Sequence, residues 1–97
     1  MPIDPRRRDE IAAAVATYDN ANPEARLPRS TVPLLTAMFP IEDVCQRSLQ
    51  DIAAEGFDRK RLAAKLRRLA EAGFLSRTPG SGVVPDAYRL HLPPVRR

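Results

Sequence analysis

Residues 58–73 read DRKRLAAKLRRLAEAG, and this segment combines two helix-end signals with one apolar stripe. Asp58 can accept the free amide hydrogens of a first helical turn as N-cap, and Gly73 can adopt the left-handed conformation that ends a helix. On a wheel of about 100° per residue the apolar side chains fall within about 60° of one another. They are Leu62, Leu66 and Leu69. The segment is therefore predicted to be a helix that buries a narrow leucine stripe in a core.

The opposite side of this predicted helix is cationic. Its basic residues are Arg59, Lys60, Arg61, Lys65, Arg67 and Arg68. Four of them lie between about 140° and 260° from Leu62 on the wheel, around the small Ala64 at about 200°. A convex cationic surface with a small central residue can enter the groove of a nucleic acid and contact phosphates on both walls. The alternative is that these charges form an ordinary solvated helix face.

The charge of the whole chain is distributed unevenly. The 97 residues carry a net charge of +4. Residues 1–57 contain six Lys and Arg against nine Asp and Glu, whereas residues 58–97 contain ten against three, so the two parts carry −3 and +7. This asymmetry indicates a polyanionic partner for the C-terminal part. A chain of this length forms one small domain that needs no disulfide or metal to stabilise its core.

A single cysteine and a single histidine restrict the chemistry of the chain. One Cys excludes an internal disulfide, and one Cys with one His gives too few ligands for a Cys/His zinc site. No carboxylate pair lies on one predicted face and no Cys–His neighbours occur, so we expect no enzyme activity, cofactor, metal or small-molecule ligand. No apolar run reaches the roughly 20 residues of a membrane span, and no signal peptide is evident, so we expect a cytoplasmic protein.

The N-terminal segment, residues 1–29, is predicted to contain a helix and a linker. Asp4 as N-cap and Pro5 at the first position begin a helix that continues to about Asp19, before the Asn-Ala-Asn-Pro run of residues 20–23. Its thin apolar stripe consists of Ile11, Val15 and Tyr18 with alanines between them. This helix either packs on the core of the domain or forms a dimer contact. Three arginines at residues 6–8 oppose the helix dipole, and are either solvated or bound to an anion.

Residues 22–29 are polar and flanked by proline, and are interpreted as a short linker before a domain that begins near Ser30. Ser30 or Thr31 can cap a short helix that ends at Pro40. Its expected buried side chains are Val32, Leu35, Met38 and Phe39. Residues 44–47 then form a short extended piece that can pair as an edge strand. The cysteine in it, Cys45, is interpreted as a small buried residue.

Ser48 begins the next helix, because Ser48 and Asp51 have the spacing of a capping box. The helix is predicted over residues 49–55, and only Gly56 and Phe57 separate it from Asp58. So short a turn makes the two helices cross steeply, with the phenylalanine filling the corner.

These residues resemble the helix-turn-helix of bacterial winged-helix regulators. The pattern of that family has an apolar–Ala pair in its second helix, here Ile52-Ala53, and a glycine near the turn, here Gly56. Its recognition helix ends with an acidic residue, Ala, Gly and an apolar residue, which matches residues 71–74. The resemblance covers about residues 30–93.

The remaining residues are predicted to form a hairpin, which is the wing of that family. One strand is expected at residues 74–77, a turn-rich loop at 78–86 and a return strand at 87–92, with Tyr88, Leu90 and Leu92 on one face. Arg89 and His91 point to the other face. The expected fold is mainly α with a small β-hairpin, a winged helix-turn-helix with an extra N-terminal helix and a basic tail at residues 94–97.

The resemblance implies a double-stranded DNA-binding protein, a transcriptional regulator associated with the nucleoid, that places helix 58–72 in the major groove. Residues of that helix would contact base edges and phosphates, and the wing would contact the flanking groove. The implied DNA-binding residues are Arg59, Lys60, Arg61, Ala64, Lys65, Arg67, Arg68, Arg77, Gly80, Ser81, Gly82 and Arg89. We expect a homodimer, formed through the N-terminal helix. The alternative is a winged-helix interaction module that binds an acidic protein partner.

Overall fold

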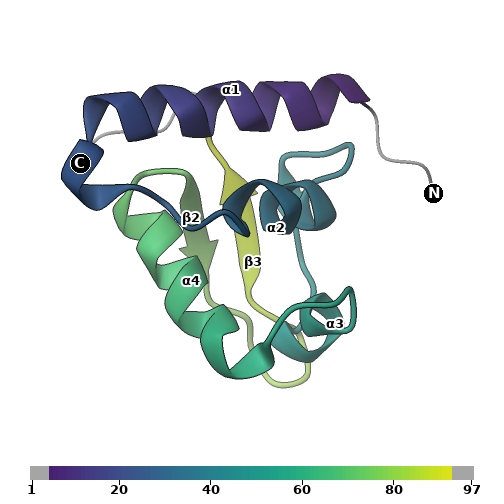
Figure 1. The fold of residues 1–97 in the computed structure, drawn as a ribbon. Coiled ribbons are helices and arrows are strands. Elements are labelled where there is room, and N and C mark those ends of the chain that lie inside the picture. Colours follow the sequence, from purple (N-terminus) through teal and green to yellow (C-terminus); the bar gives the residue numbers. More distant parts are fainter. Residues whose placement is uncertain (1–4, 93–97) are drawn as a thin grey trace.

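The computed structural model describes residues 5–92, which form four α-helices, one 3₁₀ helix and three β-strands (Figure 1). The helices are α1 (Pro5–Ala21), α2 (Thr31–Met38), α3 (Leu49–Ala53) and α4 (Arg59–Glu71), and the 3₁₀ helix is Pro23–Ala25. The strands are β1 (Val44–Cys45), β2 (Leu75–Thr78) and β3 (Ala87–Leu90). The prediction of a mainly α-helical chain with a small β element is confirmed.

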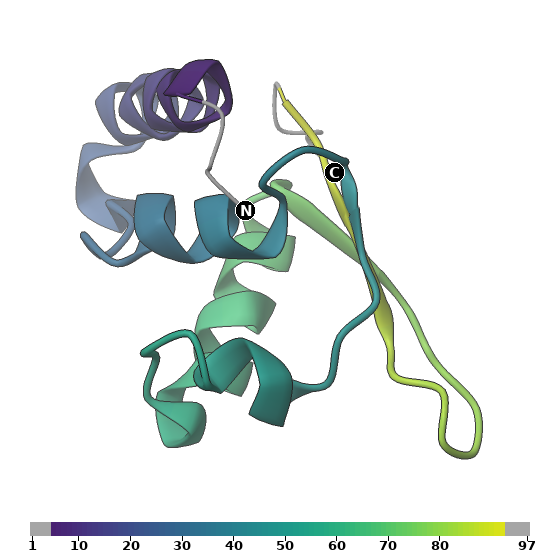
Figure 2. The ribbon, with the colours of Figure 1, turned by 90° about the vertical axis from the view of Figure 1, so that its right-hand side faces the viewer.

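The three strands form one antiparallel sheet with β3 in the centre. β2 and β3 pair with Leu75 opposite Leu90, so the predicted hairpin forms. β1 pairs with the other side of β3, with Val44 opposite Arg89, so the predicted edge strand forms as well. The helices lie on one side of this sheet, and within residues 5–92 no helix covers its other face (Figure 2).

Both ends of α4 are stabilised as the sequence predicts. At its start Asp58 Oδ1 accepts a hydrogen bond of 3.0 Å from the backbone amide of Lys60. At its end Gly73 has a φ of +90°. The Gly73 amide donates to the Ala70 carbonyl (3.1 Å) and the Phe74 amide to the Leu69 carbonyl (3.0 Å). This pair of bonds is a Schellman motif, and it turns the chain directly from α4 into β2.

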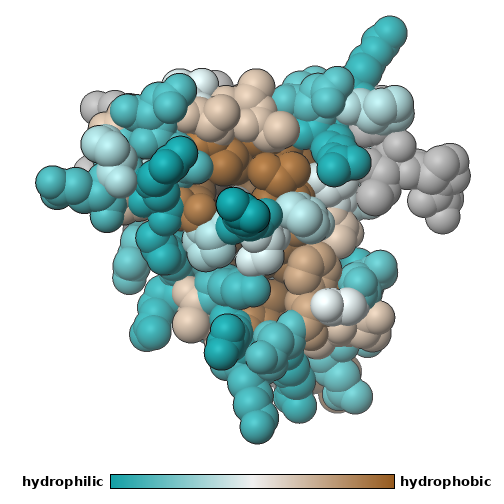
Figure 3. Space-filling model, in the orientation of Figure 1, coloured by the Kyte–Doolittle hydropathy of each residue, from teal (hydrophilic) through white to brown (hydrophobic). Residues whose placement is uncertain are grey.

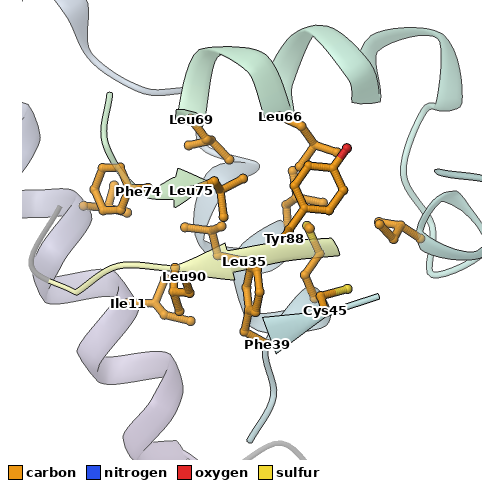
Figure 4. Packing of buried hydrophobic residues seen from close by; sticks show 14 of the residues in the cluster. Ile11, Leu35, Phe39, Cys45, Leu66, Leu69, Phe74, Leu75, Tyr88 and Leu90 are labelled. Carbon is orange, nitrogen blue, oxygen red and sulfur yellow. The ribbon is translucent and has the colours of Figure 1, made fainter. Parts of the chain in front are cut away.

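The core lies between the helices and the covered face of the sheet (Figure 4). The leucine stripe of α4 is at most 3% exposed, which confirms the predicted buried face. Leu66 and Leu69 point toward the sheet, where they meet side chains such as Leu75 and Tyr88. Ile11 and Val15 of α1 belong to the same core, so the predicted packing of the N-terminal helix on the domain is confirmed.

One arginine ties α1 to the segment before β1. Arg7 Nη2 donates to the Ile41 carbonyl (2.9 Å) and to Asp43 Oδ1 (2.6 Å), and the arginine side chain is only 13% exposed. The sequence predicts that the arginines at residues 6–8 are either solvated or bound to an anion. Arg7 is bound to an anion, the Asp43 carboxylate. This contact offsets the unfavourable position of Arg7 at the positive end of the helix dipole.

Replacement of Arg7 by alanine should lower the free energy of unfolding by about 1 kcal/mol, because it removes a half-shielded ion pair and a bond to a carbonyl. Urea denaturation followed by circular dichroism measures this loss. The neighbouring Arg8→Ala removes an exposed guanidinium of the same helix and should change stability by less than about 0.5 kcal/mol. Equal losses in the two variants would contradict the anchoring role.

Two helix boundaries differ from those predicted. α1 continues to Ala21 rather than ending at Asp19, because the backbone amide and the side-chain amide of Asn22 both donate to the Tyr18 carbonyl and close the last turn. α3 ends at Ala53 rather than Glu55, because the chain then turns toward Gly56, whose φ is +113°.

The segment 22–29 is not simply a polar linker. Leu27 is only 8% exposed and packs in the core, and its amide donates to Asp19 Oδ1 (2.9 Å). In α2 the Ser30 side chain makes no cap hydrogen bond, Leu34 is buried and Val32 is half-buried. The predicted N-cap Asp4 and the predicted tail at residues 94–97 lie outside the described residues.

Candidate nucleic-acid interface

The basic face of α4 consists of Arg59, Lys60, Arg61, Lys65, Arg67 and Arg68 with the small Ala64. All of these residues are exposed except Lys65, which is half-buried. Within residues 5–92 the side chains of Arg59, Lys60 and Arg67 form no hydrogen bond or ion pair. Arg61 approaches Asp58 at 3.8 Å but remains 80% exposed. Hydrophilic side chains gather over α4 and the α3–α4 turn, whereas apolar surface appears nearer α1 and α2 (Figure 3).

A groove of about 660 Å³ separates the basic face from the β2–β3 hairpin. Its walls come from the start of α3, from α4 and from the hairpin. The cationic residues that line it are Arg47, Arg67 and Arg77, and the small residues are Ala63, Ala64 and Ala70. Because three of the five α4 residues in this wall are alanines, an extended anionic chain can approach the helix backbone closely there. Of the predicted site residues, the groove brings together Ala64, Arg67 and Arg77.

Arg47 is a groove residue that the sequence reasoning missed. Its Nη2 donates to the Asp51 carbonyl (3.0 Å) and to Glu55 Oε1 (3.1 Å), so the guanidinium is fixed beside α3. The side chain remains 36% exposed. No local signal marks this arginine, because its position depends on how the segment after β1 packs against α3.

The hairpin loop is held closed by Asp86. Its Oδ2 forms an ion pair with Arg77 Nε (2.8 Å), and its Oδ1 accepts a hydrogen bond from the Gly80 amide (2.8 Å). A Cβ at Gly80 would overlap the Val84 carbonyl oxygen, so this position requires glycine. The charge of Arg77 is therefore balanced within the hairpin, unlike the charge of Arg67.

The other side of the basic face contacts the chain between α1 and α2. Arg68 Nη2 donates to the Arg26 carbonyl (2.6 Å), a bond that spans 42 residues of sequence. Lys65 and Arg68 also line a narrow cleft with Leu27 and Pro28. These two cations thus lie away from the groove, although Arg68 bonds a neutral carbonyl and keeps its charge.

Arg89 is separated from the other predicted site residues. It alternates along β3 with Tyr88, which lines the groove, and so it points to the open face of the sheet. There it lies opposite Val44 and Ser76. Ser76 Oγ and His91 Nε2 are 2.8 Å apart, so the histidine is a half-buried partner of Ser76 rather than an isolated surface residue.

Comparison of the chain with protein-family models, with curated proteins and with solved structures found no match. The candidate site therefore stands on its own geometry and charge.

Burial shifts the pKa of Tyr88, which lines the groove, and of Cys45, which pairs with it across β1 and β3. Burial raises the pKa of the Tyr88 hydroxyl above its usual range, against a lowering effect of Arg77. Burial also raises the pKa of the Cys45 thiol, against a lowering effect of Arg47. Cys45 is 4% exposed, which confirms the interpretation of this cysteine as a small buried residue.

Residues 5–92 contain no group of three or more His, Cys, Asp or Glu side chains placed to hold a metal ion. In the same residues no helix is both long enough and apolar enough to span a membrane.

Proposed function

We propose that this chain is a winged helix-turn-helix protein that binds double-stranded DNA and regulates transcription. The observation that carries this proposal is the basic face of α4, in which Arg59, Lys60 and Arg67 stay exposed and unpaired on a rigid, capped helix. The element order also supports it, since two helices joined by a short turn are followed at once by a hairpin. The α3–α4 turn and the hairpin loop lie at the same end of the molecule (Figures 1 and 2).

In the proposed complex α3 crosses the DNA backbone and the N-terminal half of α4 enters the major groove. Lys60, Arg61 and Ala64 then lie nearest the base edges, and Lys65 lies beside them. A phosphodiester strand follows the groove between α4 and the hairpin, where Arg67 contacts its phosphates. The hairpin loop, including Gly80, Ser81 and Gly82, contacts the flanking groove.

Two copies of the chain would bind a near-palindromic site with half-sites about one helical turn apart. α1 offers a surface for this homodimer, because Ala12, Ala13 and Ala16 are exposed on its outer side. α1 also lies at the end of the molecule away from the hairpin loop (Figure 1), so a dimer through it leaves the basic face accessible.

Charge reversal on α4 tests the proposal. The double variant Lys60→Glu/Arg67→Glu should weaken binding to duplex DNA by about 30-fold, because a cation at the base edges and a phosphate-binding cation both become anions. Fluorescence anisotropy with a labelled duplex at low salt measures the affinity. The single variants Arg67→Glu and Arg8→Glu form a matched pair with the same net charge, since Arg8 is an exposed arginine on α1.

A loss confined to the α4 variants supports the basic face as the DNA contact. An equal loss in Arg8→Glu would mean that net charge alone drives binding. Intact affinity in the double variant would refute the assigned face. If the wild-type chain fails to bind duplex at low salt while an acidic protein co-purifies with it, the interaction-module alternative is correct.

A further inference from the structure

The loop of the β2–β3 hairpin is uncharged and apolar at its tip. Residues 79–85 read PGSGVVP, without an acidic or basic side chain. Val83 is 100% exposed and Val84 is 46% exposed. A polar residue at either position would remove this apolar exposure at no cost to the core. A pair of solvent-exposed valines on one loop tip therefore points to a contact that the isolated chain does not make.

The tip is also held in one shape. The Val84 amide donates to the Ser81 carbonyl (3.0 Å), which closes a turn over residues 81–84. Gly82 within this turn has a φ of +59°. Below the turn Asp86 links the Gly80 amide to the Arg77 guanidinium. Val83 thus stands on a closed turn above a cross-linked base, and little conformational entropy would be lost when it binds.

The position of the tip relates it to the basic face of α4. In two perpendicular views the hairpin loop extends to the same end of the molecule as the α3–α4 turn (Figures 1 and 2). The charged residues at its base, Arg77 and Asp86, balance each other. The tip therefore brings no net charge to a duplex held by α4. An uncharged tip fits the sugars and base edges of a groove floor better than the phosphate rows, and the groove that α4 would leave free beside its own is the minor groove.

We propose that Val83, supported by Val84, is an apolar wedge that enters the minor groove, partly unstacks one base step and bends the duplex. This inference rests on the proposed DNA binding by α4 and adds the deformation of the DNA to it. Apolar side chains that insert between base steps kink DNA toward the major groove. Pyrimidine–purine steps unstack most easily, so the wedge selects a flexible TA or CA step next to the α4 half-site.

The experiment uses a short synthetic duplex in which 2-aminopurine replaces adenine at TA steps, with a donor and an acceptor dye at its ends. Binding of the wild-type chain should raise the 2-aminopurine fluorescence, because the base unstacks, and should raise energy transfer, because the ends approach. Val83→Ser should abolish both signals and weaken binding by about threefold to tenfold. The salt dependence of its binding should match that of wild type, because no cation is removed.

Two further variants test whether the effect depends on an apolar side chain at the loop tip rather than on the loss of any exposed valine. Val83→Leu keeps an apolar tip and should retain both signals. Val44→Ser removes an exposed valine from β1 and should retain them as well. If wild-type protein binds with a steep salt dependence but leaves the duplex straight and stacked, the wedge is wrong and the α4 proposal survives. If Val83→Ser bends the duplex as wild type does, the wedge is also wrong. If wild type binds no duplex at low salt, both proposals fail.

Discussion

Replacement of Phe74 by alanine is expected to lower the free energy of unfolding by about 3–5 kcal/mol, the range for large aromatic residues in a core. Phe74 is 0% exposed, and it joins three parts of the fold. Its ring meets the Tyr18 ring of α1 edge-on, with centroids 5.6 Å apart. Its amide bonds Leu69 in the Schellman motif, and its carbonyl accepts from the His91 amide (2.8 Å).

A loss of this size is a large share of the stability of a small domain, which is about 5–15 kcal/mol. The midpoint of thermal unfolding should fall by more than about 12 °C, since each kcal/mol shifts it by about 4–8 °C in a domain of this length. Thermal and urea unfolding followed by circular dichroism measure both quantities. Tyr18→Phe keeps the aromatic contact and should stay within about 0.5 kcal/mol of wild type. A Phe74→Ala variant within about 1 kcal/mol of wild type would show that α1 and β2 are not joined through this ring.

Local signals in the sequence predict α4 and the hairpin well. A capping aspartate, a terminal glycine and leucines at helical spacing all act within one or two turns of helix. Their effect on the structure therefore does not depend on contacts with distant parts of the chain. The hairpin follows similarly from alternating apolar residues in β3 and from the glycines of the loop. The structure confirms these elements with shifts of one or two residues at their ends.

Features that depend on distant contacts could not be predicted in this way. Leu27 is buried because the segment after α1 packs against the core. The polar residues that surround Leu27 in the sequence do not indicate this burial. Arg47 lines the groove because the segment after β1 packs against α3, where the guanidinium is held by the Asp51 carbonyl and Glu55. The bond between Arg68 and the Arg26 carbonyl joins two segments whose proximity no sequence pattern signals.

In the candidate site, too, some features follow from local sequence signals and others depend on contacts between distant segments. Helical periodicity places Arg59, Lys60 and Arg67 on one exposed face, and the structure keeps them exposed. Periodicity also places Arg89 opposite Tyr88 on β3, but only the sheet topology shows that Arg89 faces away from the groove. Arg77 lies in the groove, yet Asp86 already balances its charge.

The affinity for duplex DNA is expected to fall about a thousandfold between 50 and 200 mM salt. If about six phosphates are neutralised in the complex, the logarithm of the affinity falls with the logarithm of salt concentration at a slope of about −5. Fluorescence anisotropy titrations at several salt concentrations measure this slope. A slope shallower than about −2 would contradict binding through the basic face, because so few ions would be released.

Individual cations should contribute to this slope according to the partners that they have in the structure. Arg67→Ala should make the slope shallower by about 1, since its charge is unpaired and free to replace a counterion. Arg77→Ala should leave the slope nearly unchanged, because the ion pair with Asp86 (2.8 Å) must first be broken before Arg77 can neutralise a phosphate. Arg68 donates to a carbonyl rather than to a carboxylate, so its charge stays available and Arg68→Ala should behave like Arg67→Ala. Equal effects of Arg67→Ala and Arg77→Ala would mean that the hairpin ion pair opens on DNA, and that the wing contributes charge to the complex.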